Sequence, residues 1–239
     1  MFVTHLDKNY LPFGKLYLLS AAKNAPDENI YISAVNLTYE EIEWLKSFHP
    51  KVTIANHNVI VPETIEYRRY MQCRITKVLL EVLSKFRGEY KLCIATNVDM
   101  LIRKPMDELY TLIKNKDVLL SFDEEHKNLN EILNEVMVFD ISKFYNYFLL
   151  SFLESYNQMW DNGKIVYRDD QRQLFRVYNN FKDKLNFGSL PIDYTDKFMQ
   201  KDSHIWSARR HNRFFNYNQF CRELKLPELT ICPEGWGVL

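Results

Sequence analysis

YKLCIATNVDMLIRKP, residues 90–105, is the stretch of sequence that decides the fold. Its apolar run at 92–95 predicts a buried strand, and a polar cluster at 96–99 ends that strand. A second apolar run follows at once, and Pro105 is typical of the first turn of a helix. A carboxylate between two apolar runs, here Asp99, indicates a sheet edge that meets solvent or a ligand. The stretch therefore predicts a binding role for this strand end, and it leaves open which ligand binds and whether a metal accompanies it.

Short β-like runs alternate with helical patterns on the N-terminal side of this stretch. Strands are expected at 1–5, 30–35 and 51–56, and helices at 13–23, 38–50 and 67–86. Thr38 and Glu41 have the spacing of a capping box, which predicts where the second helix begins. Because this alternation is typical of strand-helix-strand crossovers, we expect an α/β fold with a mostly parallel sheet.

The C-terminal side is less regular. Strands are expected at 117–122 and 135–140, helical segments at 142–160 and 169–181, and a strand-like run at 187–192 before a basic, aromatic tail. The sequence contains no internal repeat and no linker rich in Gly or Ser. We therefore expect one domain over residues 1–239, with a parallel half and a mixed half.

The composition argues against several classes of protein. The 31 basic and 31 acidic residues cancel, so the overall charge indicates neither a polyanion partner nor a membrane surface. The most apolar run, Phe144 to Leu153, is too short to span a bilayer, and no transmembrane segment is expected. The four cysteines form no CxxC pair, which favours a reducing compartment. We expect a soluble, cytoplasmic protein.

Polar side chains fall at the carboxyl ends of several predicted strands. In open parallel sheets ligands bind beyond these ends, because loops and helix N-termini converge there. Asn, Asp and Thr also favour ordinary turns, so each residue taken alone has a structural explanation. Their occurrence at four strands favours a site, and the residues concerned are Thr4, His5, Asn56, His57, Asn97, Asp99 and Asp123.

Two segments carry a resemblance to a known family. FVTHLDKNYLPFGKLYLLSAAKN at 2–24 and RITKVLLEVLSKFRGEYKLCIATNVDMLIRKPMDEL at 74–109 resemble the N-terminal half of GT-A glycosyltransferases, closest to the glycogenin-like family 8 pattern. The resemblance continues more weakly through RDDQRQLF at 168–175 to SHIWSARRHNRFF at 203–215. It implies a GT-A fold in which 1–125 form a Rossmann-like nucleotide-sugar-binding half, 126–220 an acceptor-side half and 221–239 a C-terminal tail.

The resemblance also implies an activity. Family members transfer a sugar from a nucleotide-diphosphate donor to an acceptor hydroxyl, usually with a divalent metal. For this chain that implies a hexosyl- or deoxyhexosyltransferase with a nucleotide-diphosphate sugar donor, a carbohydrate or glycoprotein acceptor, and Mn²⁺ or Mg²⁺ as cofactor. It implies no nucleic-acid partner.

Site residues follow from the resemblance position by position. Thr4 and Tyr10 would flank the base, and Lys77 would approach the donor. Asn97 and Asp99 occupy the Asp-any-Asp metal motif of the family.

Further residues of the resemblance lie in the second half of the chain. Asp123 matches an acidic residue near the donor sugar, and Asp170 matches the Asp of an Asp-Gln pair beside the reacting sugar. His204 would be the late metal ligand, and Arg210 would grip the diphosphate.

The sequence departs from the family pattern at three positions. Asn97 replaces the first acid of the metal motif, and its amide oxygen binds a hard cation more weakly than a carboxylate does. Some related transferases have the sequence His-any-Trp-His-Gly near the late metal ligand. If the second histidine of that sequence is the ligand, its place is taken here by Ser207. The metal site would then have lost two ligands, at Asn97 and at Ser207. Glu135 stands where a glycine is expected.

Several alternatives stay open. Asp169 and Asp170 suit the start of a helix as caps, and Asp170 could serve as a general base or steady positive charge at the sugar carbon, with Glu124 and Glu125 as rivals. Retaining or inverting stereochemistry is undecided. Arg209, Arg210 and Arg213 could form a solvated basic face.

Two other functions compete with glycosyl transfer. The chain could be a non-catalytic sugar-nucleotide or glycan-binding domain that has lost the metal motif. It could also be a nucleic-acid-binding module that uses the tail at 206–217, where aromatic residues alternate with arginines.

Overall fold

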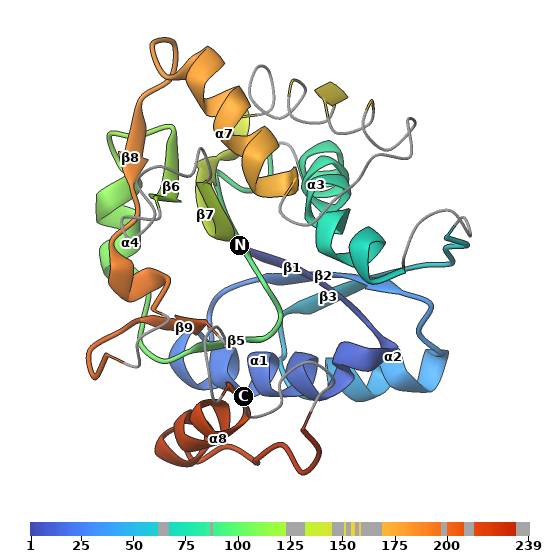
Figure 1. The fold of residues 1–239 in the computed structure, drawn as a ribbon. Helices are drawn as coiled ribbons and strands as arrows, with labels where there is room; N and C mark the ends of the chain where they lie inside the picture. The colour runs from blue at the N-terminus through green and yellow to red at the C-terminus, as the bar shows by residue number, and fades with distance from the viewer. Residues whose placement is uncertain are drawn as a thin grey trace.

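The computed structural model describes most of the chain. The described residues are 1–61, 67–86, 88–122, 132–144, 151, 154–155, 158, 169–196, 200–207 and 213–232. Within them the fold is a central mixed sheet with helices on both faces (Figure 1). Its seven strands have the order β3-β2-β1-β4-β7-β6-β8.

The N-terminal half of the sheet is parallel, as the alternation of strands and helices predicts. It consists of β1 (Phe2–Asp7), β2 (Ile30–Val35), β3 (Val52–His57) and β4 (Leu92–Thr96). The other half is mixed: β7 (Ile132–Asp140) is antiparallel to β4 and to β6 (Val118–Phe122), and β8 (Phe187–Ser189) is parallel to β6. The predicted α/β class with a parallel and a mixed half is confirmed.

Helices cover the two faces of the sheet and enclose two separate cores. On one face, α1 (Leu11–Asn24) and α2 (Tyr39–Lys46) pack on the parallel strands; on the other lie α3 (Tyr67–Phe86) and α7 (Asp169–Phe181). The structure has the Thr38–Glu41 capping box at the start of α2, as predicted. None of the described helices is long and apolar enough to cross a membrane.

Close packing of α1 on the sheet depends on a glycine. A Cβ atom added to Gly14 would lie 2.7 Å from Cδ2 of Leu6 in β1 and 3.2 Å from Cδ2 of Leu45 in α2. Both distances are shorter than ordinary carbon contacts. Glycine at this position therefore lets α1 approach β1 and α2 together.

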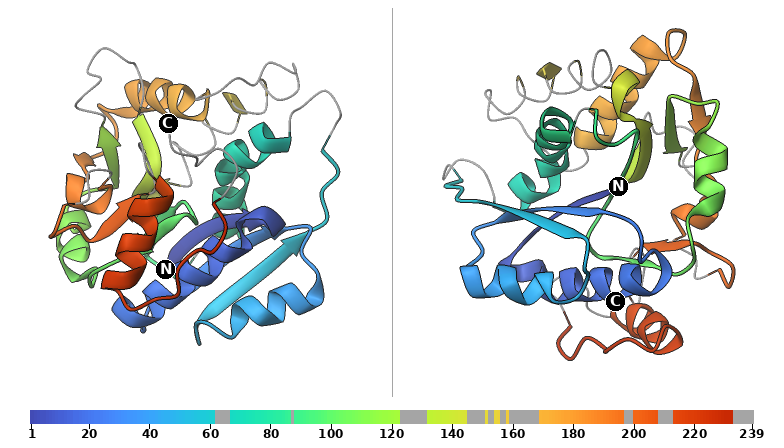
Figure 2. Two further views of the ribbon diagram at one scale, coloured as in Figure 1. Left: turned by 60° about the horizontal axis from the view of Figure 1, so that its bottom comes forward. Right: turned by 180° about the vertical axis from the view of Figure 1, so that it is seen from behind.

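Short helices, a separate two-stranded sheet and a C-terminal helix complete the described part of the fold. They are the short helices η1 (Lys8–Tyr10), α4 (Asp107–Ile113), α5 (Ile141–Phe144) and η4 (Ile192–Tyr194), the strands β5 (Met100–Ile102) and β9 (Ile205–Ser207), and α8 (Arg213–Glu223). Figure 2 shows α8 on the side of the sheet that carries α1, where Lys23 donates a hydrogen bond to the carbonyl of Leu224. The expected tail boundary at residue 221 falls inside α8.

The structure corrects three sequence-based expectations. The first strand continues to Asp7 and does not stop at residue 5. The second apolar run of the opening stretch forms β5, which pairs antiparallel with β9, and the helix after Pro105 begins only at Asp107. Pairing between distant segments decided the β5 result, and no local pattern contains that information.

Candidate functional site

The sheet has its topological switch point between β1 and β4. The chain proceeds from β1 to β2 and β3 in one direction, and then returns to place β4 on the other side of β1. In open α/β sheets the crevice at such a point, beyond the carboxyl ends of the strands, is where ligands bind. The side chains at the ends of β1 and β4 therefore define the candidate site.

Asp7 ends β1 and is the polar residue that the sequence reasoning missed. Its carboxylate accepts a hydrogen bond of 3.0 Å from the backbone N–H of Asn9 and caps η1. Tyr67, at the start of α3, hydrogen-bonds to Asp7; burial first, and then this carboxylate, raise the pKa of Tyr67 to about 12. Acidic residues favour helix caps, so Asp7 followed by a polar pair was a signal in the sequence.

Thr4 does not have the place expected for it. It lies inside β1, three residues before the strand ends, and is fully buried opposite Ile32 of β2. The structure thus places Thr4 inside β1 and not at its carboxyl end. Tyr10 does lie beyond β1: it is 37% exposed, and its ring centroid is 5.4 Å from that of Phe13.

The face of α3 beside β1 and β2 carries two cations. Arg74 is only 5% exposed; it donates hydrogen bonds of 3.0 Å to the hydroxyls of Tyr70 and Ser33, and its Nε is buried without a hydrogen-bond partner. Lys77 Nζ lies 5.4 Å from the ring centroid of the same Tyr70. Both cations thus lie near Tyr70 on one face of α3.

A neutral histidine lies beside Arg74. Nε2 of His5 is 2.9 Å from the carbonyl oxygen of Met71, so this nitrogen carries the hydrogen. Burial, and then the charge of Arg74, lower the pKa of His5 to about 4. The imidazole therefore adds no charge to this region near neutral pH.

At the end of β4 the polar cluster forms a turn between β4 and β5. The backbone N–H of Asn97 donates a hydrogen bond of 3.1 Å to the carbonyl of Glu135 in β7. Asn97 and Asp99 are both partly exposed, and Val98 between them is buried. The charge of Asp99 reaches the buried Tyr217 of α8, whose pKa is raised well above its usual value mainly by burial, with contributions from Cys221 and Asp99.

His204 is not where the expected metal ligand belongs. In the β5–β9 ladder Met100, next to Asp99, pairs with Ser207, whereas the His204 carbonyl accepts from the backbone of Arg103 at the opposite end. Its ring stacks on Tyr194 at 4.6 Å between centroids, and Nδ1 is 3.1 Å from a carboxylate oxygen of Asp193.

The register therefore supports the alternative that placed Ser207, a non-imidazole residue, at the ligand position. Among the described residues no group of three or more His, Cys, Asp or Glu side chains could hold a metal ion. The oxygen donors that remain at the end of β4 suit a hard divalent cation, but the imidazole is not among them.

The other predicted residues are divided between described and undescribed segments. Asp170 lies in the first turn of α7, which begins at Asp169 as the sequence predicts, and both carboxylates are largely buried. Asp169 is 3.4 Å from Nη1 of Arg172. Asp123 and Arg210 lie outside the described residues, as do Glu124, Glu125 and Arg209.

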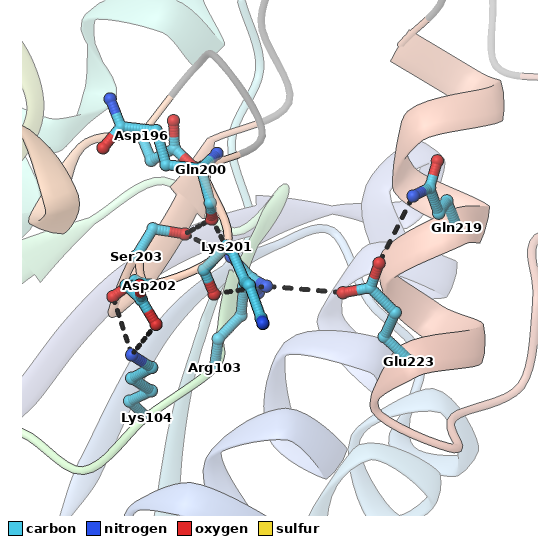
Figure 3. Close-up of polar contacts among 9 residues, drawn as sticks. All are labelled: Arg103, Lys104, Asp196, Gln200, Lys201, Asp202, Ser203, Gln219 and Glu223. Carbon is cyan, nitrogen blue, oxygen red and sulfur yellow. Dashed lines mark hydrogen bonds and ion pairs between the residues drawn. The ribbon is translucent and has the colours of Figure 1, made fainter.

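Arg103 holds the segments around β5 together, although the sequence reasoning gave it no role. Figure 3 shows its guanidinium between a turn at 200–203 and Glu223 of α8. It donates to the carbonyl of Gln200 at 2.8 Å and to the hydroxyl of Ser203, and Nη2 lies 3.3 Å from the Glu223 carboxylate. Its central carbon lies 4.0 Å from the ring centroid of Phe220.

The aromatic tail does not present a stacking surface for nucleic acid in the part of it that is described. Trp206 and Tyr217 are both fully buried in the core below the sheet, and their ring centroids are 5.4 Å apart. Phe215 is exposed. Since base stacking requires accessible rings, the nucleic-acid interpretation loses its main support.

Comparisons with known proteins identify the fold. No protein-family model and no curated protein sequence matches the chain. Among solved structures, it is similar to the galactosyltransferase LgtC in complex with donor and acceptor sugar analogs, with a TM-score of 0.62 and 11% identity over 98% of each chain.

Two further similar structures are enzymes of related kind. The chain matches the glycosyltransferase GlyE of Streptococcus pneumoniae TIGR4 with a TM-score of 0.62 and 12% identity, over 96% of this chain and 65% of that one. It matches mouse xyloside xylosyltransferase 1 with a TM-score of 0.55 and 11% identity, over 86% and 96% of the chains. At such low identities these matches establish the architecture of the chain.

Proposed function

Since the chain has the GT-A glycosyltransferase fold, we propose that it is a glycosyltransferase, which moves a sugar from a nucleotide-diphosphate donor to an acceptor hydroxyl. The observation that carries the proposal is the topological switch point between the ends of β1 and β4. There Asp7 and Tyr10 from one strand end face the same edge of the sheet as Asn97 and Asp99 from the other.

We assign the donor to this switch point by the chemistry of the residues around it. A nucleotide base needs an aromatic face and hydrogen-bonding groups, which Tyr10 and Asp7 supply at the end of β1. The diphosphate needs cations, and we propose Arg74 and Lys77 on α3 for this role, with Arg210 as a further candidate. These groups would hold the leaving nucleotide while the glycosidic bond breaks.

A metal ion would be held by the turn after β4. Asp99 and Asn97 present oxygen atoms there, and Mn²⁺ or Mg²⁺ bound to them would neutralise charge that develops on the departing diphosphate. The position of Ser207 next to this turn offers a hydroxyl but no imidazole. Metal affinity should therefore depend on the carboxylates of the site.

Asp170 is our candidate for the carboxylate that assists the reacting centre. It lies at the N-terminus of α7, where the helix dipole favours the ionised form. In an inverting reaction it would take the proton of the acceptor hydroxyl, and in a retaining one it would balance positive charge at the sugar carbon. Asp123 is proposed near the donor sugar.

The acceptor and the compartment belong to the same proposal. We propose a carbohydrate or glycoprotein acceptor, a hexosyl or deoxyhexosyl donor group and a cytoplasmic location. The last of these rests on the reduced cysteines: among the described thiols, those of Cys93 and Cys221 are free and buried.

A donor panel tests the function. The full chain is incubated with nucleotide-diphosphate sugars that differ in base and sugar, with Mn²⁺ or with a chelator, and the released nucleotide is measured. Release from one donor that increases when an acceptor sugar is added supports the proposal. Nucleotide binding without release from any donor contradicts it.

That second result would favour the other candidate, a non-catalytic sugar-nucleotide-binding domain. Two observations favour it: Asn97 lacks the charge of the family motif, and the ring of His204 is engaged by Asp193 and Tyr194. Binding would then persist with the same affinity in the presence of a chelator.

A further inference from the structure

We propose that Glu135 of β7 supplies the carboxylate that Asn97 lacks, and that Glu135, Asn97 and Asp99 together bind a divalent metal ion. This goes beyond the proposed function by assigning a ligand that the family pattern does not contain. It rests on the proposed function only for the role of the metal in the reaction, because metal binding is measured without a nucleotide.

The register of the sheet puts Glu135 directly opposite Asn97. In the antiparallel β4–β7 ladder Leu92 pairs with Asp140 and Thr96 with Val136, so the next pair is Asn97 with Glu135. The hydrogen bond of 3.1 Å from the Asn97 N–H to the Glu135 carbonyl extends the ladder by this pair. Opposite residues in such a ladder point to the same face, with Cβ atoms about 5 Å apart. One cation can contact both side chains at that separation.

Glu135 is also exceptional for its burial. It is a strand residue with 0% exposure, and acidic residues are rarely so fully buried. It lies at the carboxyl end of β4, where the candidate site begins, and therefore its burial is at the site and not in a remote part of the core.

The pairing of β7 with its other neighbour, β6, is irregular near Glu135. Against β6, the register of β7 shifts between the pairs Leu120–Met137 and Ser121–Leu133, so residues 134–136 fall between the two registers. Of these residues, Val136 and Glu135 stay in line with β4, opposite Thr96 and Asn97. Such irregularities are common beside active sites, where they redirect a side chain. Here the shift occurs at the residue that faces Asn97.

The charges of the pair explain why position 97 is neutral. An aspartate at 97 would lie directly across the ladder from the Glu135 carboxylate, and like charges in opposite positions destabilise a sheet. With Asn97 and Glu135 the pair carries one negative charge, as an aspartate with a glycine opposite would. The carboxylate has in effect moved from β4 to β7, and with Asp99 it forms a set of hard oxygen ligands.

The experiment measures Mn²⁺ binding to the full-length protein by calorimetry and by the EPR signal of free Mn²⁺, without nucleotide. We expect E135Q to weaken binding at least about tenfold, and N97D/E135Q, which returns the carboxylate to β4, to recover most of the affinity. E81Q is the matched control, because Glu81 is a partly buried carboxylate on α3 that pairs with His57. Its Mn²⁺ affinity should equal that of the unchanged protein.

Two results overturn the proposal: the same Mn²⁺ affinity in E135Q as in the unchanged protein, or no Mn²⁺ binding by the unchanged protein at millimolar concentrations. Circular dichroism checks that E135Q folds; if it does not, N97D/E135Q decides alone, and loss of binding there contradicts the exchange. Nucleotide-diphosphate binding in chelator is measured separately. Mn²⁺ binding that depends on Glu135 without nucleotide binding would refute the proposed function and leave this inference standing.

Discussion

Asn97 is neutral where the family motif has a charged aspartate. The negative charge of the turn after β4 therefore depends on Asp99. Replacing Asp99 by Asn removes the remaining charge without changing the shape of the side chain. We expect kcat/KM for transfer to fall by about 100-fold or more, since loss of a group that stabilises transition-state charge typically costs this much. Donor-dependent release of nucleotide is the measurement.

Asp202 provides the control for this substitution. It is an exposed aspartate in the 200–203 turn, and its contacts with Lys104 are at the surface. Asp202→Asn should leave transfer within about twofold, because exposed ion pairs contribute little free energy. Equal activity of Asp99→Asn and the unchanged protein would show that Asp99 has no part in the reaction.

His5 makes stability depend on pH. Its pKa is about 4 in the folded protein, through burial and then the charge of Arg74, against about 6.5 in an unfolded chain. The unfolded chain therefore binds more protons between these values, so the free energy of unfolding is fully retained above about pH 6.5 and decreases as the pH falls toward 4. The expected loss is about 3 kcal/mol.

Urea denaturation between pH 7 and pH 4.5 measures this loss. His5→Gln keeps a donor for the Met71 carbonyl and cannot be protonated, so its stability should fall less steeply over the same range. Because other groups titrate equally in both proteins, the difference between the two slopes isolates His5. Parallel slopes would mean that His5 is accessible to protons in the folded state.

At the scale of elements, Arg103 connects segments that are far apart in the chain, which the local sequence around it does not indicate. It joins β5 to the 200–203 turn and to α8 by the contacts in Figure 3 and by its stacking on Phe220. Arg103→Ala should lower the free energy of unfolding by about 2–3 kcal/mol, through lost hydrogen bonds to charged groups and lost packing. Arg103→Lys should recover only part of this, because an ammonium group lacks the planar fork.

Lys104 is the matched control beside it. In the described contacts its ammonium group reaches only Asp202, at the surface, so Lys104→Ala should change the free energy of unfolding by less than about 1 kcal/mol. Thermal and chemical denaturation of the three variants gives the comparison. Equal stability of the Arg103 and Lys104 alanine variants would contradict a connecting role for Arg103.

For the molecule as a whole, some features could be predicted from the sequence and others could not. The parallel half was predictable because each strand and helix there has its own period, and the capping box at Thr38 and the exact span of α7 are local signals. The GT-A architecture followed from a motif whose Asp99 is in the expected turn. These predictions needed only residues that are close together in the chain.

The remaining features depend on contacts across the chain. The pairing of β5 with β9 decides that Ser207 lies next to Asp99 and that His204 does not. The β4–β7 register decides that Glu135 faces Asn97. Thr4 was misplaced for a different reason: the strand extends two residues beyond its expected end at residue 5, so Thr4 lies inside it. Spacing in the sequence cannot distinguish these arrangements.

A ligand that bridges β1 and β4 should stabilise the molecule as a unit. Groups on both sides of the switch point contribute to the proposed donor site, so a bound nucleotide diphosphate would oppose unfolding of both halves. At a concentration 100 times its Kd, such a ligand adds about 2.7 kcal/mol. For a chain of this size, this predicts a rise in Tm of about 5–10 °C in a single transition.

Differential scanning fluorimetry with nucleoside diphosphates of each base measures this rise, and Tyr10→Ala identifies where the ligand binds. The Tyr10 side chain is 37% exposed, so its loss should change the ligand-free Tm much less than the loss of a buried ring would. The ligand-induced rise should shrink, because base stacking is worth about 1–3 kcal/mol in sites where bases lie on aromatic rings. If every nucleoside diphosphate leaves the Tm unchanged at millimolar concentration, the crevice at the switch point does not bind a nucleotide. An equal rise in Tyr10→Ala would instead move the base away from the end of β1.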